Sequence, residues 1–152
     1  MGSSPSLAVT LRKALAHEHS AIQALVQAIA DETFADLFPP PVPFGEPDWH
    51  AAWLAISEDA IVGVMMTDEE WVSDLWISRD HRRCGVGSML LAHAEGEIRN
   101  RGHRLFRLRV VQSNVRAVVF YQRHGWHIHR EFPHEKFGHA MLEMAKLAED
   151  LK

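Results

Sequence analysis

The chain of 152 residues is 47% hydrophobic and 24% charged, the balance of a globular domain rather than of a disordered or membrane-spanning chain. Its formal net charge of −4 argues against nucleic acid as the main partner, and no apolar run approaches the roughly 20 residues that a membrane span requires. The single cysteine excludes an intramolecular disulfide, so we expect a cytoplasmic protein that has neither a nucleic-acid nor a membrane partner.

The N-terminal third of the chain predicts one strand and one helix. We expect a flexible tail over residues 1–8 and a single domain over residues 9–152. Residues 9–11 are typical of a short strand, and the three-to-four spacing of apolar residues within 17–31 predicts an amphipathic helix. Residues 38–45 contain too many prolines for a helix or a central strand, so we interpret them as a stiff loop, with the wall of a binding pocket as the alternative.

The rest of the chain alternates between strand and helix patterns. Two apolar runs around the turn Glu58-Asp59 predict a hairpin, and a third strand follows it. Two helices are predicted to end near Gly102 and Gly125. The last segment reads as a strand, although a helix over residues 141–151 fits its pattern equally well. In order, we expect strands at 53–57, 60–67 and 71–77, a helix at 86–101, a strand at 104–111, a helix at 114–124, and strands at 126–132 and 139–145.

Residues 82–88, Arg-Arg-Cys-Gly-Val-Gly-Ser, lie between a predicted strand and a predicted helix. Small residues at the start of a helix leave its first N–H groups open, and these groups bind phosphate oxygens at the positive end of the helix dipole. A dinucleotide-binding fingerprint would require a third glycine where Leu90 stands, and a Walker loop would require a lysine where Gly87 is followed by Ser88. Both motifs are therefore excluded, and the glycines alone fit a plain turn as well as an anion site.

The segments around this loop narrow the choice. Arg82, Gly85 and Gly87 form an Arg-x-x-Gly-x-Gly pattern that resembles the acyl-CoA-binding motif of the GNAT superfamily of N-acyltransferases. Residues 74–80 are similar to the end of that family's fourth strand and the loop beyond it, and residues 114–126 are similar to its second conserved block. Two motifs in the family's order and at its separation make the resemblance far more specific than either motif alone.

The resemblance implies a mixed α/β fold with a mostly antiparallel central sheet, splayed between its fourth and fifth strands and flanked by helices. It also implies acetyl-CoA as the cosubstrate, with the pantetheine arm between the splayed strands and the pyrophosphate on the loop and helix start. A backbone N–H of the fourth strand would polarise the thioester carbonyl, where negative charge develops during attack by an amine. The implied cofactor-binding residues are Leu75, Trp76, Ile77, Arg82, Arg83, Cys84, Gly85, Val86, Gly87, Ser88 and Asn114.

Two side chains are the candidates for proton transfer. The resemblance implies that Tyr121, the only tyrosine, is the general acid that protonates the leaving thiolate, and a buried core tyrosine is the alternative. Asp74 is the candidate general base, and strand alternation predicts that it shares a face with Val72 and Trp76. It could equally hold a cationic acceptor. Further carboxylates precede this strand, and we interpret them as a solvated turn: Asp68, Glu69 and Glu70.

The eleven histidines form no recognisable metal motif. His17 and His19 would lie on different sides of a helix. A strand would instead place His127, His129 and Glu131 on one face, but no spacing supplies a further ligand. We therefore expect no metal site.

These observations lead to one expected function and several alternatives. We expect an N-acetyltransferase in which a primary amine attacks the thioester of acetyl-CoA directly. The expected acceptor is a small molecule (a polyamine, an amino acid or a xenobiotic amine), and a protein lysine or N-terminus is the alternative. Two alternatives are not enzymes: a non-catalytic acyl-CoA sensor on the same fold, and an unrelated α/β interaction domain. Members of the family often form homodimers, although the sequence identifies no interface.

Overall fold

The computed structural model describes residues 8–82 and 84–148. The predicted tail over residues 1–8 therefore lies almost entirely outside the described residues, as do Arg83 and residues 149–152. The described elements are β1 (Val9–Lys13), η1 (Ala16–Glu18), α1 (His19–Thr33), η2 (Trp49–Ala51), β2 (Trp53–Ser57), β3 (Ala60–Asp68), β4 (Trp71–Ile77), η3 (Arg79–His81), α2 (Val86–Asn100), β5 (Leu105–Val111), α3 (Val115–Arg123), β6 (His127–Pro133) and β7 (Ala140–Leu147). Each predicted strand and helix corresponds to one of them within two residues at either end.

The C-terminal segment is a strand, which decides between the two structures that its pattern allowed. β7 pairs antiparallel with β5 on one side and with β6 on the other. Its residues are mostly good helix formers, but both edges of the segment lie beside strands that satisfy its backbone groups. Tertiary pairing therefore overrides helix propensity.

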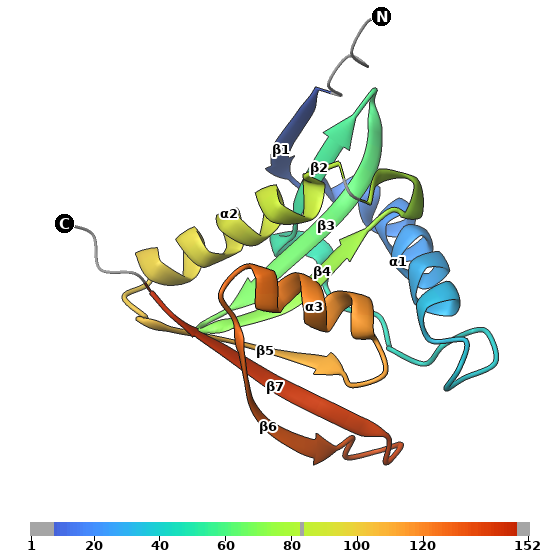
Figure 1. Cartoon of the computed structure of the whole chain (residues 1–152). Coiled ribbons are helices and arrows are strands. Elements are labelled where there is room, and N and C mark those ends of the chain that lie inside the picture. The colour runs from blue at the N-terminus through green and yellow to red at the C-terminus, as the bar shows by residue number, and fades with distance from the viewer. Residues whose placement is uncertain (1–7, 83, 149–152) are drawn as a thin grey trace, which may run out of the picture.

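The seven strands form one sheet in the order β1-β2-β3-β4-β5-β7-β6, and the sheet opens between β4 and β5 (Figure 1). These two strands run parallel, whereas the other neighbours are antiparallel. Their register pairs only Trp71 with Arg107 and Val72 with Leu108, and the strands diverge beyond that point. Backbone groups of residues 73–77 that point away from β3 thus have no strand partner in the described part of the chain. The splay implied by the resemblance is confirmed.

A β-bulge in β4 decides which side chains face which side of the sheet. In β3, Met66 lies opposite Asp74 and the next residue, Thr67, lies opposite Val72, so Ser73 is the extra residue of the bulge. Because an extra residue shifts the alternation, Val72 lies on one face while Asp74 lies on the other. The prediction that Asp74 shares a face with Val72 is wrong. The prediction that it shares one with Trp76 is confirmed, because strict alternation resumes after the bulge.

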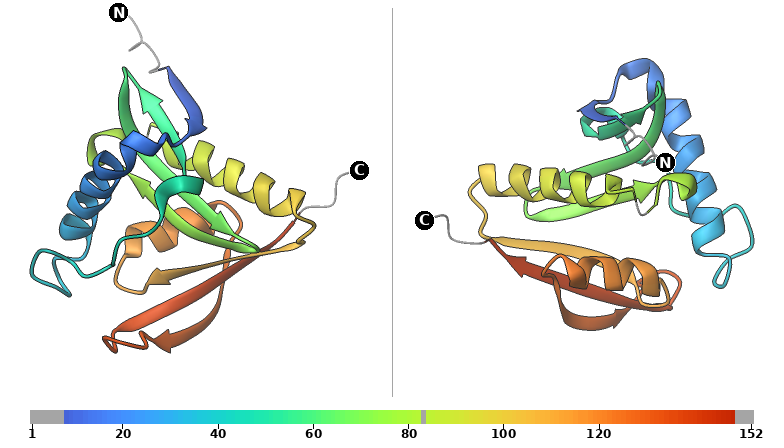
Figure 2. Two further views of the ribbon diagram at one scale, coloured as in Figure 1. Left: turned by 180° about the vertical axis from the view of Figure 1, so that it is seen from behind. Right: turned by 45° about the horizontal axis from the view of Figure 1, so that its top comes forward.

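Each face of the sheet has its own hydrophobic core. α2 and α3 cover one face, which we call the α2 face; its core includes Val72, Leu90 and Phe106. α1 covers part of the other face, which we call the α1 face; its core includes Ile22 and Trp49. The view from behind shows α1 over the N-terminal half of the sheet, with none of the described helices over β5, β7 and β6 on that side (Figure 2). The α1 face is therefore open next to the splay.

Gly63 tests how closely α2 packs on β3. A Cβ at this position would lie 2.7 Å from Cδ1 of Leu90, a fully buried side chain with no room to move. We expect Gly63→Ala to lower the free energy of unfolding by about 1–3 kcal/mol, as overpacking of a core does. Gly96→Ala is the matched control, because a Cβ there meets no atom within 4 Å. It should instead raise stability by up to about 1 kcal/mol through its helix propensity. Urea denaturation of both variants measures the two signs, and a stable Gly63→Ala variant would contradict the close packing.

Candidate active site

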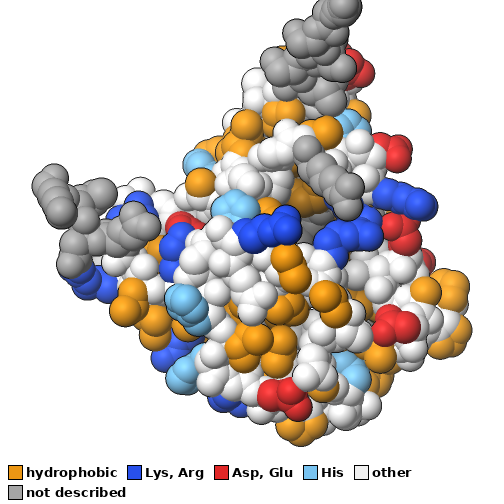
Figure 3. Space-filling model, viewed as in Figure 1, with side chains coloured by type: hydrophobic (Ala, Val, Ile, Leu, Met, Phe, Trp, Pro, Cys, Tyr) orange, Lys and Arg blue, Asp and Glu red, His pale blue; other side chains and the backbone are white. Residues whose placement is uncertain are grey.

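The start of α2 is built to receive an anion. Gly85 is the N-cap residue in a left-handed conformation (φ 82°), and no side chain caps the helix. The first intrahelical hydrogen bond of this turn is donated by the amide of Met89 to Gly85 O, 3.0 Å, which leaves the amides of Val86, Gly87 and Ser88 without an intrahelical partner. Lys and Arg side chains gather beside this helix end in the space-filling view (Figure 3). These features fit the phosphate groups of CoA.

The loop before α2 is tied to α1 through arginine. Arg82 donates to Oε1 of Glu32 at 3.2 Å, and Arg79 approaches Oε2 of the same carboxylate at 3.4 Å. Cys84 is exposed, and its predicted neighbour Arg83 lies outside the described residues. The paired guanidinium of Arg82 thus positions the loop, while the open amides come from the helix itself.

α3 approaches the first turn of α2 closely at Gly87. A Cβ at Gly87 would lie 3.2 Å from Cζ of Phe120, so a larger residue would push the two helices apart. His124 adds a polar contact: its Nδ1 lies 2.8 Å from Phe120 O, and its Nε2 lies 2.9 Å from Oγ of Ser88. A carbonyl only accepts, so Nδ1 carries the proton, and the Ser88 hydroxyl donates to Nε2. No sequence pattern pointed to His124, because its partner Ser88 lies in another helix.

Tyr121 lies at the inner side of α3 with its side chain 8% exposed. Its ring contacts those of Phe120 and Trp126, with centroids 5.4 and 6.0 Å apart. Burial raises the pKa of Tyr121 above its ordinary value, and the nearby Asp74 carboxylate raises that pKa further. Among the hydrogen bonds of the described residues, none involves the Tyr121 hydroxyl. The phenol is therefore protonated over the working pH range and retains its proton for transfer.

Asp74 reaches the same opening from β4. Burial raises the pKa of its carboxyl, and hydrogen bonds from Trp76 and Ser73 partly oppose that effect. The indole Nε1 of Trp76 donates to Oδ1 of Asp74 at 3.0 Å. Asp74 belongs to the α1 face and Tyr121 comes from the α2 side, yet the carboxylate acts on the phenol. The structure thus places the two predicted proton-transfer residues on either side of the splay, within electrostatic reach of each other.

Asn114 has a structural role that the sequence did not predict. It is the N-cap of α3, and its Oδ1 accepts a hydrogen bond from the amide of Ala117 at 3.3 Å. The cap leaves the side-chain amide nitrogen of Asn114 available. The predicted contact of Asn114 with the cofactor would therefore be made by this nitrogen, and it stays a prediction.

The other candidate bases lie away from this site. Glu69 and Glu70 form the turn between β3 and β4, next to the paired, closed end of the splay. The Glu69 carboxylate lies 3.1 Å from Nε2 of His103, and the Glu70 carbonyl accepts from the amide of Arg107. These contacts agree with the interpretation of a solvated turn, in which Asp68 and Glu69 are exposed.

Two loops lie along the α1 face of the splay. The loop after α1 places Phe44 against Trp76, with ring centroids 5.9 Å apart, and Phe34 meets the same indole edge-on at 6.4 Å. Between these two residues in the chain, Phe38 contacts the rings of Phe137 and His139 at 5.0 and 5.7 Å. The proline-rich loop therefore runs from β4 to the turn between β6 and β7, as a wall of the opening would.

The histidines do not gather into a metal site. A bulge in β6 at His129 changes the register, so His127 lies opposite Ala145 and Glu131 lies opposite Leu142. Those two partners are three residues apart in β7, and therefore His127 and Glu131 face opposite sides of the sheet. The prediction that they share one face is wrong. Within residues 8–82 and 84–148, no three His, Cys, Asp or Glu side chains are grouped to hold a metal ion.

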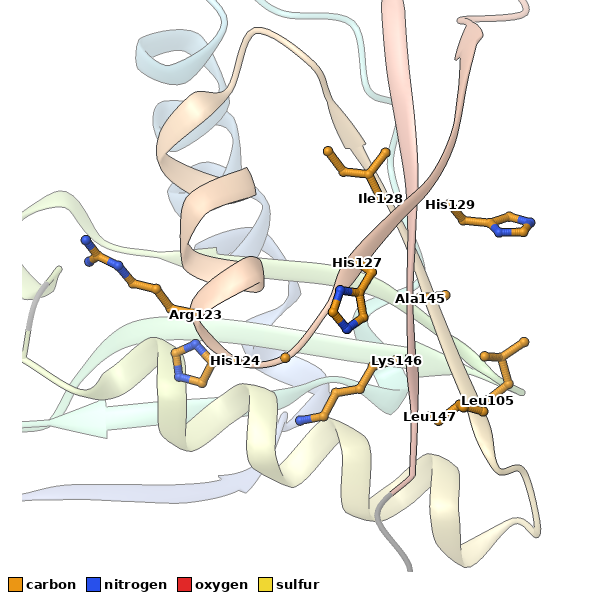
Figure 4. A pocket seen from close by; sticks show the side chains of 10 residues that line it. Leu105, Arg123, His124, His127, Ile128, His129, Ala145, Lys146 and Leu147 are labelled. Carbon is orange, nitrogen blue, oxygen red and sulfur yellow. The ribbon is translucent and has the colours of Figure 1, made fainter.

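A cavity of about 670 Å³ lies elsewhere, at the end of α3. Figure 4 shows His124, His127 and Lys146 around it, with Leu105 and Leu147 at its far side. The Lys146 ammonium is paired with the carboxylate of Glu95 at 2.9 Å, which also accepts from the indole of Trp126. Neither Tyr121 nor Asp74 lines it, so this cavity is separate from the predicted site of acyl transfer.

Comparison with solved structures defines the class of protein: an N-acetyltransferase fold. The apo form of YjaB from Escherichia coli is 22% identical, with a TM-score of 0.75 over 94% of this chain and 100% of that one. A GCN5-related N-acetyltransferase from Rhodopseudomonas palustris is 16% identical (TM-score 0.76, 96% and 99% covered). PaiA N-acetyltransferase from Thermoplasma acidophilum in complex with coenzyme A is 14% identical (TM-score 0.72, 93% and 99% covered). No curated protein sequence matches the chain.

The chain belongs to the GNAT acetyltransferase family, whose domain model matches residues 46–148. It is accordingly an acyl-CoA-dependent N-acetyltransferase, and its acyl donor is acetyl-CoA. Among the described helices, none is both long and apolar enough to cross a membrane.

Asp74→Asn should separate stability from activity. Because burial raises the pKa of Asp74, the folded protein binds this proton more tightly than the unfolded chain does. That contribution is present below the unfolded pKa of about 4 and is lost as the pH rises through the folded pKa. At pH 7 the neutral asparagine should therefore raise Tm while turnover falls, and the gain should vanish toward pH 4. Thermal unfolding against pH measures this, with Asp36→Asn at an exposed position as the control. A loss of stability at pH 7 would contradict the buried, ionisable carboxyl.

Proposed function

We propose that this protein transfers the acetyl group of acetyl-CoA to the primary amine of a small molecule by direct attack. One observation supports the proposal: Tyr121 and Asp74 flank the splay from opposite faces of the sheet, near enough for the carboxylate to raise the pKa of the phenol. An acid on the side of α2 and a base on the open α1 face match a reaction in which the nucleophile arrives on one side and the leaving group departs on the other.

The donor would be held by backbone groups. The open edge of β4 would offer the amides and carbonyls of Leu75 and Ile77 to the amide groups of the pantetheine arm. The backbone groups of Trp76 point the other way, toward Val64 of β3, because they alternate with those of its neighbours and Ser78 bonds to Val62 on that side. The amides at the start of α2, from Val86 to Ser88, would take the pyrophosphate. The glycines on either side of Val86 keep side chains away from these amides. Because backbone groups bind the donor in this arrangement, the side chain of Cys84 is not required.

The chemical step exchanges one bond for another. The amine nitrogen attacks the thioester carbonyl carbon, an N–C bond forms, and the C–S bond breaks. Before attack, Asp74 takes one proton of the acceptor ammonium, directly or through water. As the C–S bond breaks, Tyr121 gives its proton to the departing thiolate, and the second proton that the nitrogen loses restores the phenol. A β4 amide near Trp76 would stabilise the negative charge that develops on the carbonyl oxygen.

The surroundings of the opening favour a small acceptor. Phe44 and Trp76 line it on one side, and the rings of Phe38, Phe137 and His139 lie in contact with one another near its other end. These ring contacts join the loop after α1 to β4 and to the turn between β6 and β7, and they leave less room for a folded polypeptide than an open groove would. A protein N-terminus or lysine is therefore the second choice.

The experiment that tests the proposal follows CoA release from acetyl-CoA with a panel of small amines, peptides with free N-termini, and lysine peptides. Release with small amines at rates well above those with peptides is the expected result. Tight CoA binding without release by any amine would overturn the proposal in favour of a sensor.

Tyr121→Phe removes only the acidic proton. We expect kcat to fall by roughly 10²-fold or more, the usual contribution of a general acid, while the dissociation constant of CoA stays unchanged. Because burial raises the pKa of Tyr121, the wild-type kcat should not decline through ionisation of this phenol below pH of about 10. Turnover against pH, together with calorimetric CoA binding, measures both. Equal kcat in the two proteins across this range would remove Tyr121 from the mechanism.

A further inference from the structure

The uncovered part of the α1 face carries an unusual concentration of arginine and aromatic side chains. Arg107 and Arg109 of β5 alternate with the core residues Phe106 and Leu108, so their side chains lie on this face. Arg130 of β6 joins them, because it pairs with Glu143, which lies opposite Arg109 in β7. Figure 2 shows no described helix over these strands on that side. Three guanidinium groups thus lie on this uncovered face, and those of Arg107 and Arg109 belong to the strand that borders the splay.

One buried carboxylate serves two of these arginines. Glu143, 3% exposed, lies 3.1 Å from Arg130 and 3.8 Å from Arg107. Arg109 has no such partner: across residues 8–82 and 84–148, no ion pair and no side-chain hydrogen bond involves its guanidinium. The local charge is therefore positive, and Arg109 carries the unbalanced part of it.

Arg109 is held in place by aromatic rings and not by acids. Its guanidinium carbon lies 4.8 Å from the ring centroid of Trp71 and 5.8 Å from that of Phe132. Cation–π contacts fix the plane of a guanidinium while its N–H groups remain available at the edge. A planar, pre-positioned fork of donors is the group that binds carboxylate or phosphate in two parallel hydrogen bonds.

A cavity adjoins this guanidinium. It has a volume of about 250 Å³, and Arg109, Arg130, Phe132 and His134 are among the residues that line it. Nδ1 of His134 accepts hydrogen bonds from the amides of Lys136 and Phe137, both 3.1 Å, so its ring is fixed with the proton on Nε2. Exposed Glu135 is the one acid in the lining, and its chain neighbour is Lys136. The volume suits a small acid and not a peptide.

The register places one lining residue of this cavity, Arg109, at the splay. Val72 and Leu108 form the last β4–β5 pair. Beyond that pair, Arg109 is the first residue of β5 on the α1 face, and Asp74 is the first residue of β4 on it after the bulge. Asp74 and the guanidinium of Arg109 therefore lie on the two strands that border the same opening.

We propose that the acceptor is a small amine that also carries a carboxylate or phosphate group, with Arg109 binding that anion and Arg130 supporting it. This inference rests on the proposed function, because it assigns the acceptor of the same site. Arg109 is a specificity residue: it contacts the non-reacting end of the acceptor while Asp74 faces the amine. An amino acid or an amino phosphate fits this description, and a polyamine does not, because its second ammonium would meet the guanidinium.

The first experiment compares matched acceptors in acetyl-CoA-dependent CoA release. ω-Amino carboxylates of two to six carbons are assayed against diamines of the same length, and phosphoethanolamine is assayed against ethanolamine. We expect kcat/KM to be at least about tenfold higher for the anionic member of a pair, as for one charge-assisted hydrogen bond. The two pairs also distinguish a carboxylate from a phosphate. Diamines that match or exceed the amino acids would overturn the proposal, as would transfer to acidic peptides only.

The second experiment uses Arg109→Gln and a matched control. Arg99→Gln also removes a guanidinium that lies over an aromatic ring, 5.8 Å from the centroid of Phe106, but on α2. For the preferred anionic acceptor, Arg109→Gln should raise KM by about tenfold or more with little change in kcat, and should leave the KM of the matched diamine unchanged or lower. Arg99→Gln should change neither. Equal effects of Arg109→Gln on both acceptors would show a merely structural role.

A binding measurement separates the failure of this inference from that of the proposed function. N-acetyl-4-aminobutanoate, a reaction product of the expected class, is titrated into the CoA complex of the wild type and of Arg109→Gln by calorimetry. If no amine releases CoA, the proposed function fails, but weaker product binding in Arg109→Gln alone would still support the anion site. If transfer occurs and binding is the same in both proteins, only the anion site is overturned.

Discussion

The brief pairing of β4 with β5 is the constraint on which the rest of the structure depends. Two paired positions join the strands, after which β4 stays with β3 and β5 stays with β7. The bulge at Ser73 falls at the point of separation, where an extra residue bends a strand and increases its twist. The opened edge leaves backbone amides and carbonyls without strand partners, and such groups favour an extended ligand with amide groups of its own. The pantetheine arm of acetyl-CoA has that character.

The same opening explains why the proposed acid, Tyr121, and the proposed base, Asp74, have complementary properties. Burial raises the pKa of Tyr121, which keeps the phenol protonated, and it raises the pKa of Asp74, which makes its carboxylate a stronger base. Each charged form would also be disfavoured by the other, because a phenolate and a carboxylate repel. Before reaction, the favoured state is thus a neutral phenol and an ionised carboxylate, as proton transfer in opposite directions requires.

Most elements of the fold could be predicted from sequence because apolar periodicity and glycine positions mark their ends. The loop at Gly85 and Gly87 could be found for the same reason, since helix starts have a local signal. What could not be predicted depends on contacts between distant segments. The face of Asp74 required the bulge at Ser73, and alternation assumes that no bulge exists. The Ser88–His124 contact joins two helices, and the second β-bulge, at His129, depends on pairing with β7.

The arginines of the open face bear on the chemistry as well as on recognition. A primary amine reaches the site as an ammonium ion and must lose a proton before it can attack. An ionised Asp74 alone would stabilise the ammonium and hold back that loss, because opposite charges favour the charged form. A guanidinium across the opening acts in the opposite direction, since like charges disfavour it. Arg109 is suited to this effect because it lacks a carboxylate partner among the described residues, unlike Arg107 and Arg130 beside Glu143. When the acceptor's own acid group binds the guanidinium, it neutralises part of the repulsion between Arg109 and the ammonium, but it also positions the amine. The acceptor's amine must reach Asp74 on β4 while its acid group reaches Arg109 on β5. The length of the acceptor therefore determines how the opposite effects of Asp74 and Arg109 on the ammonium balance.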